Sequence, residues 1–390
     1  MTGSEPMDGS GVRITIGASL ATALSAIPPF LLGSLLPAIR TELDIDTGSL
    51  GALVSVYFFA GALSAVPGGR LAEKLGGRGG LMFTGSVTSA SLILIALVVE
   101  TEVQLGAAMI IAGGANGMVH PAGNLAIVRG VARRFQGISF GTKQAAAPLA
   151  TLFAGLALPT VGLTLGWQAA FLAATVLFPI VVLTMPRESD SENSRYERTP
   201  IPLSRPLIMI AGASALAFGA ATTIGAFLVD SVTSSGGSAV SAGTTLTVAS
   251  AAAISVRLII GWQTDRRTSP SITLVAALMA IGAVGFLLLA LAPGWGAALG
   301  AIIGMAAGWG WPGLLYHAIS HSHPDAPASA TAVATTGNAL GAAVGPLTFG
   351  LIAGGFSFTF AWSVSGLELL LAAALMLLAS RSASARPTAR

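Results

Sequence analysis

Cysteine is absent from this sequence of 390 residues, and charged residues are scarce. Without cysteine the chain has no disulfide, no thiolate metal ligand and no thiol nucleophile. Charged residues make up 9% of it, against roughly 25% in soluble proteins, whereas hydrophobic residues reach 53%. A soluble chain of this length would form two or more domains, each needing a charged surface that this composition cannot supply. The composition therefore indicates that a lipid bilayer is the solvent.

Several functional motifs are also missing. No Gly-x-x-x-x-Gly-Lys-Ser/Thr phosphate loop occurs, so a nucleotide-driven pump is not expected. The formal net charge is +3, but the basic residues lie between apolar runs instead of forming one patch, so we expect no nucleic-acid partner. The only histidine cluster is His317, His321 and His323, where we expect a solvated segment rather than a metal site. Without a concentrated acid, base or metal-ligand cluster, the chain is predicted to be no enzyme and to use no cofactor.

Twelve apolar runs recur from end to end, each long enough to cross about 30 Å of hydrocarbon. They lie near residues 14–38, 48–67, 80–99, 104–128, 137–161 and 166–185, and then 206–229, 241–262, 271–292, 295–319, 327–354 and 357–379. The first run has no small-residue cleavage site after it, so we expect a retained helix rather than a signal peptide. The predicted fold is an all-α membrane protein with twelve transmembrane helices.

Basic residues between the runs set the predicted orientation, because Lys and Arg accumulate on the cytoplasmic side of a membrane. With both termini in the cytoplasm, the outer loops contain only one basic residue, Arg40. Acidic residues of the outer loops carry little topological weight; they are Glu42, Asp44, Asp46, Glu100, Glu102 and Asp230. We therefore predict a multi-pass protein of the cell (inner) membrane with cytoplasmic termini.

The chain divides into two related halves. A polar stretch from Arg187 to Arg205 separates residues 1–186 from residues 206–390, and we interpret it as a cytoplasmic linker between two six-helix bundles. The segment Gly69-Arg70-Leu71-Ala72-Glu73-Lys74-Leu75-Gly76-Gly77-Arg78 has a counterpart in Gly261-Trp262-Gln263-Thr264-Asp265-Arg266-Arg267. The prolines of helices 4 and 5 pair with those of helices 10 and 11: Pro121 with Pro312, and Pro148 with Pro346. Landmarks in the same order indicate an internal duplication.

The segment 69–78 resembles the loop between helices 2 and 3 of the major facilitator superfamily, Gly-x-Leu-Ala-Asp-(Arg/Lys)-x-Gly-(Arg/Lys)-(Arg/Lys). Together with the twelve runs, the resemblance covers essentially the whole chain. It departs from the pattern at Glu73, where the family usually has Asp, and at Gly77, where it usually has a base. The resemblance implies a secondary transporter whose two halves rock around a site at the middle of the membrane.

The same resemblance implies gating residues. Arg70 and Glu73 would hold the halves together on the cytoplasmic side while the protein is open outward, and Asp265 with Arg266 would be a weaker copy. Arg257 lies about one turn inside the end of helix 8, where the family often has an arginine, and we expect a conformational role for it. The complete predicted gating set is Gly69, Arg70, Glu73, Lys74, Arg78, Arg257, Asp265 and Arg266. Alternatively, the bases at 70, 74 and 78 only determine topology.

Ionisable residues inside spans are costly and are candidates for function; here they are His120, Lys143 and Glu368. Asn116, His120 and Asn124 recur at intervals of four and share one stripe of helix 4. Lys143, followed by Gln144, lies at a similar depth in helix 5. No carboxylate lies deep within the first six runs, so the solute itself could be the counter-charge of Lys143. We therefore predict a small organic or inorganic anion as the solute. Alternatively, Lys143 binds carbonyls freed by Pro148 or lies near water.

Helix 5 also bears on the subfamily. Its Gly-x-Lys-Gln stretch before Pro148 is weakly similar to cyanate-type and related small-solute members. Drug antiporters of the superfamily usually have Gly-x-x-x-Gly-Pro there, whereas Lys143 and Ala147 occupy those glycine positions here. A proton-coupled antiporter for drugs or metabolites is the first alternative function, and a membrane-embedded enzyme or sensor is the second.

Further candidates lie outside helices 4 and 5. Tyr57, Trp309, Trp311 and Asn338 could line a central cavity, although the aromatic residues could equally be packing. Glu368 lies in the middle of helix 12, where a carboxyl group without a partner favours its neutral form and could carry a coupling proton. Because helix 12 is peripheral in the family it resembles, a hydrogen-bonded structural role is the alternative. The predicted partners are thus an anionic solute, a coupling proton and the bilayer.

Overall fold

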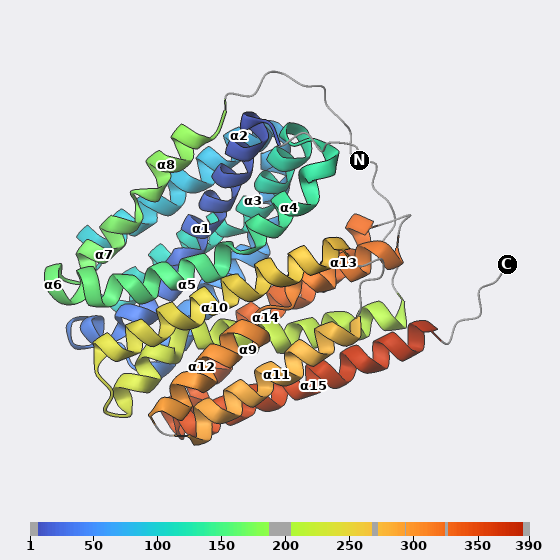
Figure 1. Ribbon diagram of the computed structural model, residues 1–390. Coiled ribbons are helices and arrows are strands. Elements are labelled where there is room, and N and C mark those ends of the chain that lie inside the picture. Colours follow the sequence, from blue (N-terminus) through green and yellow to red (C-terminus); the bar gives the residue numbers. More distant parts are fainter. Residues whose placement is uncertain (1–6, 187–203, 267–271, 293, 324–326, 385–390) are drawn as a thin grey trace.

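The computed structural model describes residues 7–186, 204–266, 272–292, 294–323 and 327–384. Within these ranges, only the backbone is described for residues 261–266, 327–328 and 383–384. All secondary structure in the described ranges is helical (Figure 1). The first half contains α1 (Gly9–Leu43), α2 (Thr47–Leu97), α3 (Glu102–Gly130), α4 (Arg133–Gln144), α5 (Ala146–Ala157), the π-helical turn Leu158–Gly162, α6 (Leu163–Leu165), α7 (Trp167–Ala174) and α8 (Leu177–Thr184). The second half contains α9 (Arg205–Ser234), α10 (Ala239–Arg266), α11 (Ile272–Leu291), α12 (Trp295–Gly308), α13 (Pro312–Ser322), α14 (Pro327–Gly355) and α15 (Phe358–Ser384).

Helix α2 contains two passes through the membrane. Its 51 residues would extend about 75 Å as one straight helix, far more than the hydrocarbon core can hold. The chain turns at Gly76, whose φ of 75° and ψ of 171° lie outside the helical region and suit a residue without a side chain. The segment 69–78 is therefore helical on both sides of a single sharp break rather than an open loop.

The membrane passes agree with the twelve predicted runs. Ten helices of the described residues are long and apolar enough to span a membrane, and α2 is counted once among them although it passes twice. Helix α3 is not among the ten because Asn116, His120 and Asn124 lower its hydropathy. Adding the second pass of α2 and helix α3 gives twelve. The predicted all-α fold of two six-helix bundles is confirmed. The exact boundaries 1–186, 187–205 and 206–390 stay a prediction, because residues 187–203 lie outside the described residues.

Three predicted spans are interrupted near proline. The span 166–185 is broken at Thr175–Val176, because Pro179 has no backbone N–H to donate to the carbonyl of Thr175. The span 137–161 is broken at Ala145, because Pro148 has no backbone N–H to donate to the carbonyl of Gln144. The span 295–319 is broken at Trp309–Trp311, just before Pro312 begins α13. Each break leaves main-chain carbonyl groups available inside the membrane, where they need other donors.

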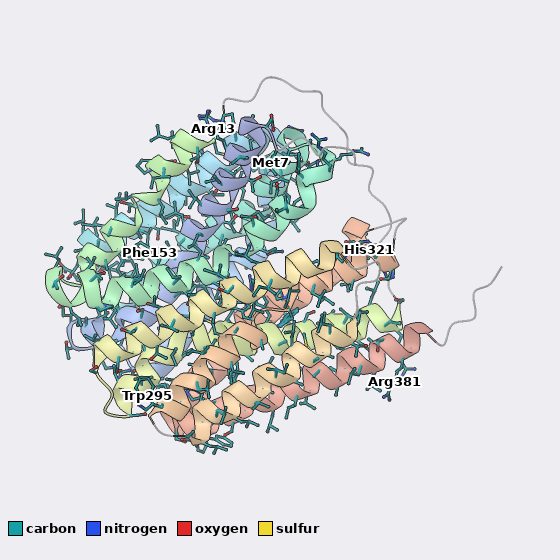
Figure 2. All side chains as sticks on the ribbon, in the orientation of Figure 1. Met7, Arg13, Phe153, Trp295, His321 and Arg381 are labelled. Carbon is teal, nitrogen blue, oxygen red and sulfur yellow. The ribbon has the colours of Figure 1, made fainter. Side chains whose placement is uncertain are left out.

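The two halves meet unevenly across the membrane. We call the side where α1 begins and α15 ends the terminal face, and the side of Leu43, Thr47 and Ser234 the opposite face (Figure 1). Arg13, His321 and Arg381 lie towards the terminal face, whereas Trp295 lies at the opposite face (Figure 2).

Close contacts between the halves occur in the part towards the opposite face. Glycines allow this approach: a Cβ on Gly33 of α1 would lie 2.0 Å from the carbonyl oxygen of Ala226 in α9. A Cβ on Gly51 of α2 would lie 2.5 Å from the carbonyl oxygen of Pro346 in α14. Towards the terminal face the helices of the two halves spread apart (Figure 1). The fold therefore has the form of a V that is closed at the opposite face.

Candidate functional site

Lys143 is buried where helices α1, α3 and α4 meet. Its side chain is 3% exposed, and Nζ donates hydrogen bonds to Asn124 Oδ1 and, over 3.3 Å, to the main-chain oxygen of His120. Gly123 makes room for the stem, because a Cβ at that position would lie 3.3 Å from Lys143 Cδ. Both acceptors are neutral oxygens. The ammonium group is thus solvated by the protein, but no carboxylate among these partners balances its charge.

Asn124 and His120 extend this polar group outward. An ammonium group has only donors, so Asn124 must turn its oxygen towards Lys143 and its two amide N–H groups away from it. Both Asn124 and His120 are exposed although they lie deep within a span. One side of α3 contacts α2 at Gly113 and Gly117, and another side contacts Lys143 at Gly123. The stripe with His120 and Asn124 lies between these two sides. His120 and the amide donors of Asn124 are therefore accessible on this side of α3, beside Lys143.

The third member of the stripe, Asn116, belongs to a separate hydrogen-bonded group. Its Oδ1 accepts a hydrogen bond of 3.2 Å from Ser25 Oγ in α1, and Asn116 is half-buried. Tyr57 is fully buried, and its hydroxyl donates to the main-chain oxygen of Ser25. These contacts join α1, α2 and α3 and place Tyr57 inside the bundle. Roles of Tyr57 and Asn116 in solute binding stay predictions.

Arg257 of α10 connects the helix breaks at Ala145 and at Trp309–Trp311. Its guanidinium donates to the carbonyl of Gln144, which Pro148 leaves without its usual helical donor. Its Nε also donates over 3.1 Å to the carbonyl of Trp309, at the break between α12 and α13. One alternative was that Lys143 binds carbonyls freed by Pro148. The Gln144 carbonyl is bound by Arg257 instead. Arg257 thereby joins α10 of the second half to the end of α4 in the first half.

The two tryptophans of this region are buried, and Trp309 contacts the first half. Trp309 is 5.5 Å from the ring of Phe30 in α1 and 6.3 Å from that of Phe218 in α9. Trp311 donates from Nε1 to the carbonyl of Gly308 at 2.9 Å, whereas Trp309 Nε1 has no partner in the described part of the chain. Neither side chain is more than 1% exposed, so both are covered by protein in this conformation.

Asn338 and Glu368 complete the candidates of the second half. Asn338 donates from Nδ2 to the Tyr316 hydroxyl at 2.7 Å, and its buried Oδ1 has no partner among the described residues. Glu368 is half-buried on the outer helix α15. Gln144 is half-buried at the end of α4. Their predicted roles remain untested.

The predicted gating residues of the segment 69–78 lie at the terminal face. Arg70, Glu73 and Lys74 are exposed there, Gly69 is half-buried, and Arg78 donates over 3.4 Å to the carbonyl of Met185 in its own half. Of Asp265 and Arg266 the structure gives only the backbone in α10, so these two predictions lie outside the described side chains.

Sequence analysis missed the contact that joins the halves at the opposite face. Arg40 of α1 forms an ion pair of 2.8 Å with Asp230 of α9, the one ion pair the structure gives between described side chains. A signal was present, because Arg40 is the only basic residue of the predicted outer loops and Asp230 is one of few acidic ones. Nothing in the sequence indicated which acid is its partner.

Twelve membrane passes in two bundles, with polar groups between the bundles, define a membrane transporter. A family model described as Major Facilitator Superfamily matches residues 18–346, and the chain belongs to this family. Members of the family are transporters, so the protein is a secondary transporter in a membrane rather than an enzyme. Comparison with curated protein sequences finds no match.

Solved structures share the fold at low sequence identity. A bacterial homologue of the human lysosomal transporter Spinster, in an inward-facing and occupied conformation, has a TM-score of 0.74 and 16% identity, covering 97% of this chain and 98% of that one. The same homologue in an inward-facing, unoccupied conformation has a TM-score of 0.71. A D-xylose-proton symporter has a TM-score of 0.76 and 17% identity, covering 94% and 97% of the two chains. At this identity the likeness concerns the fold alone.

Proposed function

We propose that the protein transports a small organic or inorganic anion across the cytoplasmic membrane by alternating access. The observation that carries the proposal is the environment of Lys143, which is buried, bonded to neutral oxygens and adjacent to the exposed His120 and Asn124. A buried charge without a counter-charge is costly, and an anion entering the space between the halves lowers that cost. Asn124 supplies N–H donors to the same anion.

The terminal face is then the cytoplasmic one. Loops and helix ends on this face carry nearly all the basic residues outside the spans, whereas the opposite face carries Arg40. This asymmetry is the one that membrane insertion imposes on cytoplasmic loops. With that orientation, the V of the structure opens towards the cytoplasm and the termini are cytoplasmic. The likeness to a bacterial transporter in an inward-facing conformation supports the same state.

Arg70 and Glu73 fit a gate that forms only in the other state. On the open side of the V both side chains are exposed, which is compatible with partners in the other half that arrive when this side closes. Arg257 bridges the halves, so we assign it to the moving parts rather than to the solute.

The binding test is thermal stabilisation of the detergent-solubilised protein by a panel of small anions, because a ligand that binds the folded state raises the melting temperature. Lys143→Met is expected to abolish the stabilisation given by the best anion. Arg13→Met is the control, because Arg13 is exposed, lies in the same half and, among the described residues, donates only to the carbonyls of Leu183 and Thr184. Undiminished stabilisation of Lys143→Met would reject the assignment.

A coupling proton is the second part of the proposal. Glu368 is the only acidic residue in the middle of a predicted span, and we assign to its carboxyl group the binding and release of this proton. The structural resemblance to a proton symporter is a likeness of fold and leaves the coupling ion of this chain to experiment. Uptake that is independent of pH and unchanged in Glu368→Gln would remove the residue from the mechanism.

A further inference from the structure

We propose that Arg40, Thr47 and Asp230 form a latch that closes the opposite face and that must open once in every transport cycle. This inference concerns the conformational balance of the protein and does not depend on which solute is carried. It rests on contacts between residues that lie far apart in the sequence and in different halves.

The latch uses both oxygens of one carboxylate. Arg40 Nη2 of α1 lies 2.8 Å from Asp230 Oδ1, and the Thr47 hydroxyl at the start of α2 donates to Asp230 Oδ2 over 2.8 Å. Arg40 Nη2 also donates to Thr47 Oγ1 at 3.1 Å. Asp230 belongs to α9 of the second half, so two helices of the first half hold one side chain of the second. Such a charged group with several hydrogen bonds is a strong contact.

Burial makes the contact depend on the conformation. Asp230 is 1% exposed, whereas the Arg40 side chain is 38% exposed. A carboxylate that is withdrawn from water needs its cation and its hydrogen bonds, and losing one partner leaves it uncompensated. When the halves separate at this face, water replaces the partners. Arg40 and Thr47 therefore stabilise the closed face and contribute little to the open one, which is how a contact shifts a conformational equilibrium.

The packing beneath the latch is tight enough to keep it in register. A Cβ on Gly225, five residues before Asp230, would lie 2.9 Å from the ring of Phe30 in α1. At Gly33 the backbones of α1 and α9 approach as closely as described above. The latch thus lies at the outer end of a continuous α1–α9 contact, and opening this contact separates Arg40 from Asp230.

A control for the latch is a contact at the same face that lies within one half. Glu42, two residues after Arg40 on the same helix and at the same face, accepts a hydrogen bond of 2.7 Å from Trp167 Nε1 of α7. Both residues belong to the first half, so Glu42 moves with its partner. A Glu42→Gln variant alters charge at the same face without altering a contact between the halves.

The test measures the distance between the halves at the opposite face. Because the chain has no cysteine, spin labels can be attached to Glu100→Cys in the first half and Val240→Cys in the second, both of which are exposed. Arg40→Gln and Asp230→Asn are expected each to raise the ratio of the long distance to the short one by about tenfold or more. The double variant is expected to match the single ones, because both substitutions remove one shared contact.

The latch is rejected if Arg40→Gln and Asp230→Asn leave the distance distribution unchanged, or if Glu42→Gln shifts it as far. Should either variant lose its cooperative melting, Thr47→Val replaces it, since valine keeps the branched shape and removes one hydrogen bond to Asp230. Thr47→Val is expected to shift the distribution in the same direction by a smaller factor, and no shift would also overturn the proposal.

Discussion

A single methyl group at Gly33 should move the protein from one conformation towards the other. A Cβ there would lie 2.0 Å from the carbonyl oxygen of Ala226 and 2.7 Å from its carbon, where ordinary contact begins near 3.4 Å. The obstacle is backbone, so no side-chain rotation relieves it, and α1 and α9 must separate by roughly 1 Å or more. Separation of these helices at this depth is the movement that opens the opposite face.

The size of the effect follows from the cost of overpacking. Forcing an extra methyl group into a packed interface costs about 1–3 kcal/mol. Because the halves part here when the opposite face opens, that cost is confined to the conformation in which this face is closed. The ratio of protein open at the opposite face to protein open at the terminal face should therefore rise by about 5- to 150-fold in Gly33→Ala.

Gly341 of α14 is the matched control. A Cβ on Gly341 would also lie 2.0 Å from a carbonyl oxygen, that of Ala215 in α9, but both helices belong to the second half. Gly341→Ala should lower the melting temperature without changing the conformational ratio. The assay uses spin labels at the terminal face, on Arg133→Cys and Arg381→Cys, both exposed, together with thermal melting. The reasoning is refuted if Gly33→Ala leaves the label distance unchanged in a folded protein, or if Gly341→Ala shifts it equally.

The remaining predictions concern the solute, the gate and the coupling proton. Lys143→Met should weaken binding of the best anion by about tenfold or more, whereas binding by Arg13→Met should remain normal in an equilibrium titration. Glu73→Gln should slow exchange of solute across proteoliposome membranes more than it weakens binding, and a loss confined to affinity contradicts the gate. Glu368→Gln should abolish pH-dependent uptake while leaving anion binding intact, and equal loss of both indicates a structural role.

Much of the fold could be predicted from the sequence because hydrocarbon imposes a simple rule on span length and polarity. The twelve runs, the duplicated prolines and the Gly69–Arg78 motif all correspond to helices or breaks of the structure. The sequence also placed His120 in the span 104–128 at a similar depth to Lys143 in the span 137–161, and the structure has a hydrogen bond between these two residues. His120 precedes Arg129 by the same interval by which Lys143 follows Arg134, and this spacing on two consecutive helices was sufficient for that inference.

Contacts between the halves could not be predicted in the same way. Which acid contacts Arg40 depends on how far the two bundles rotate against each other. Because one sequence encodes all conformations of the cycle, it does not indicate which of them contains a given contact. The partner of Arg257 was hidden for a related reason. Pro148 indicates that the carbonyl of Gln144 is free, but the donor comes from a helix more than a hundred residues away.

Reciprocal movement of the two faces is the most direct test of the whole account. The label pair at the opposite face, Glu100→Cys with Val240→Cys, and the pair at the terminal face, Arg133→Cys with Arg381→Cys, would be measured in the otherwise unchanged protein, in Arg40→Gln and in Gly33→Ala. Alternating access predicts that every gain in the long distance at one face equals a loss of the long distance at the other. Distances that lengthen at both faces together, or at one face alone, would contradict two rigid halves rocking about a central site.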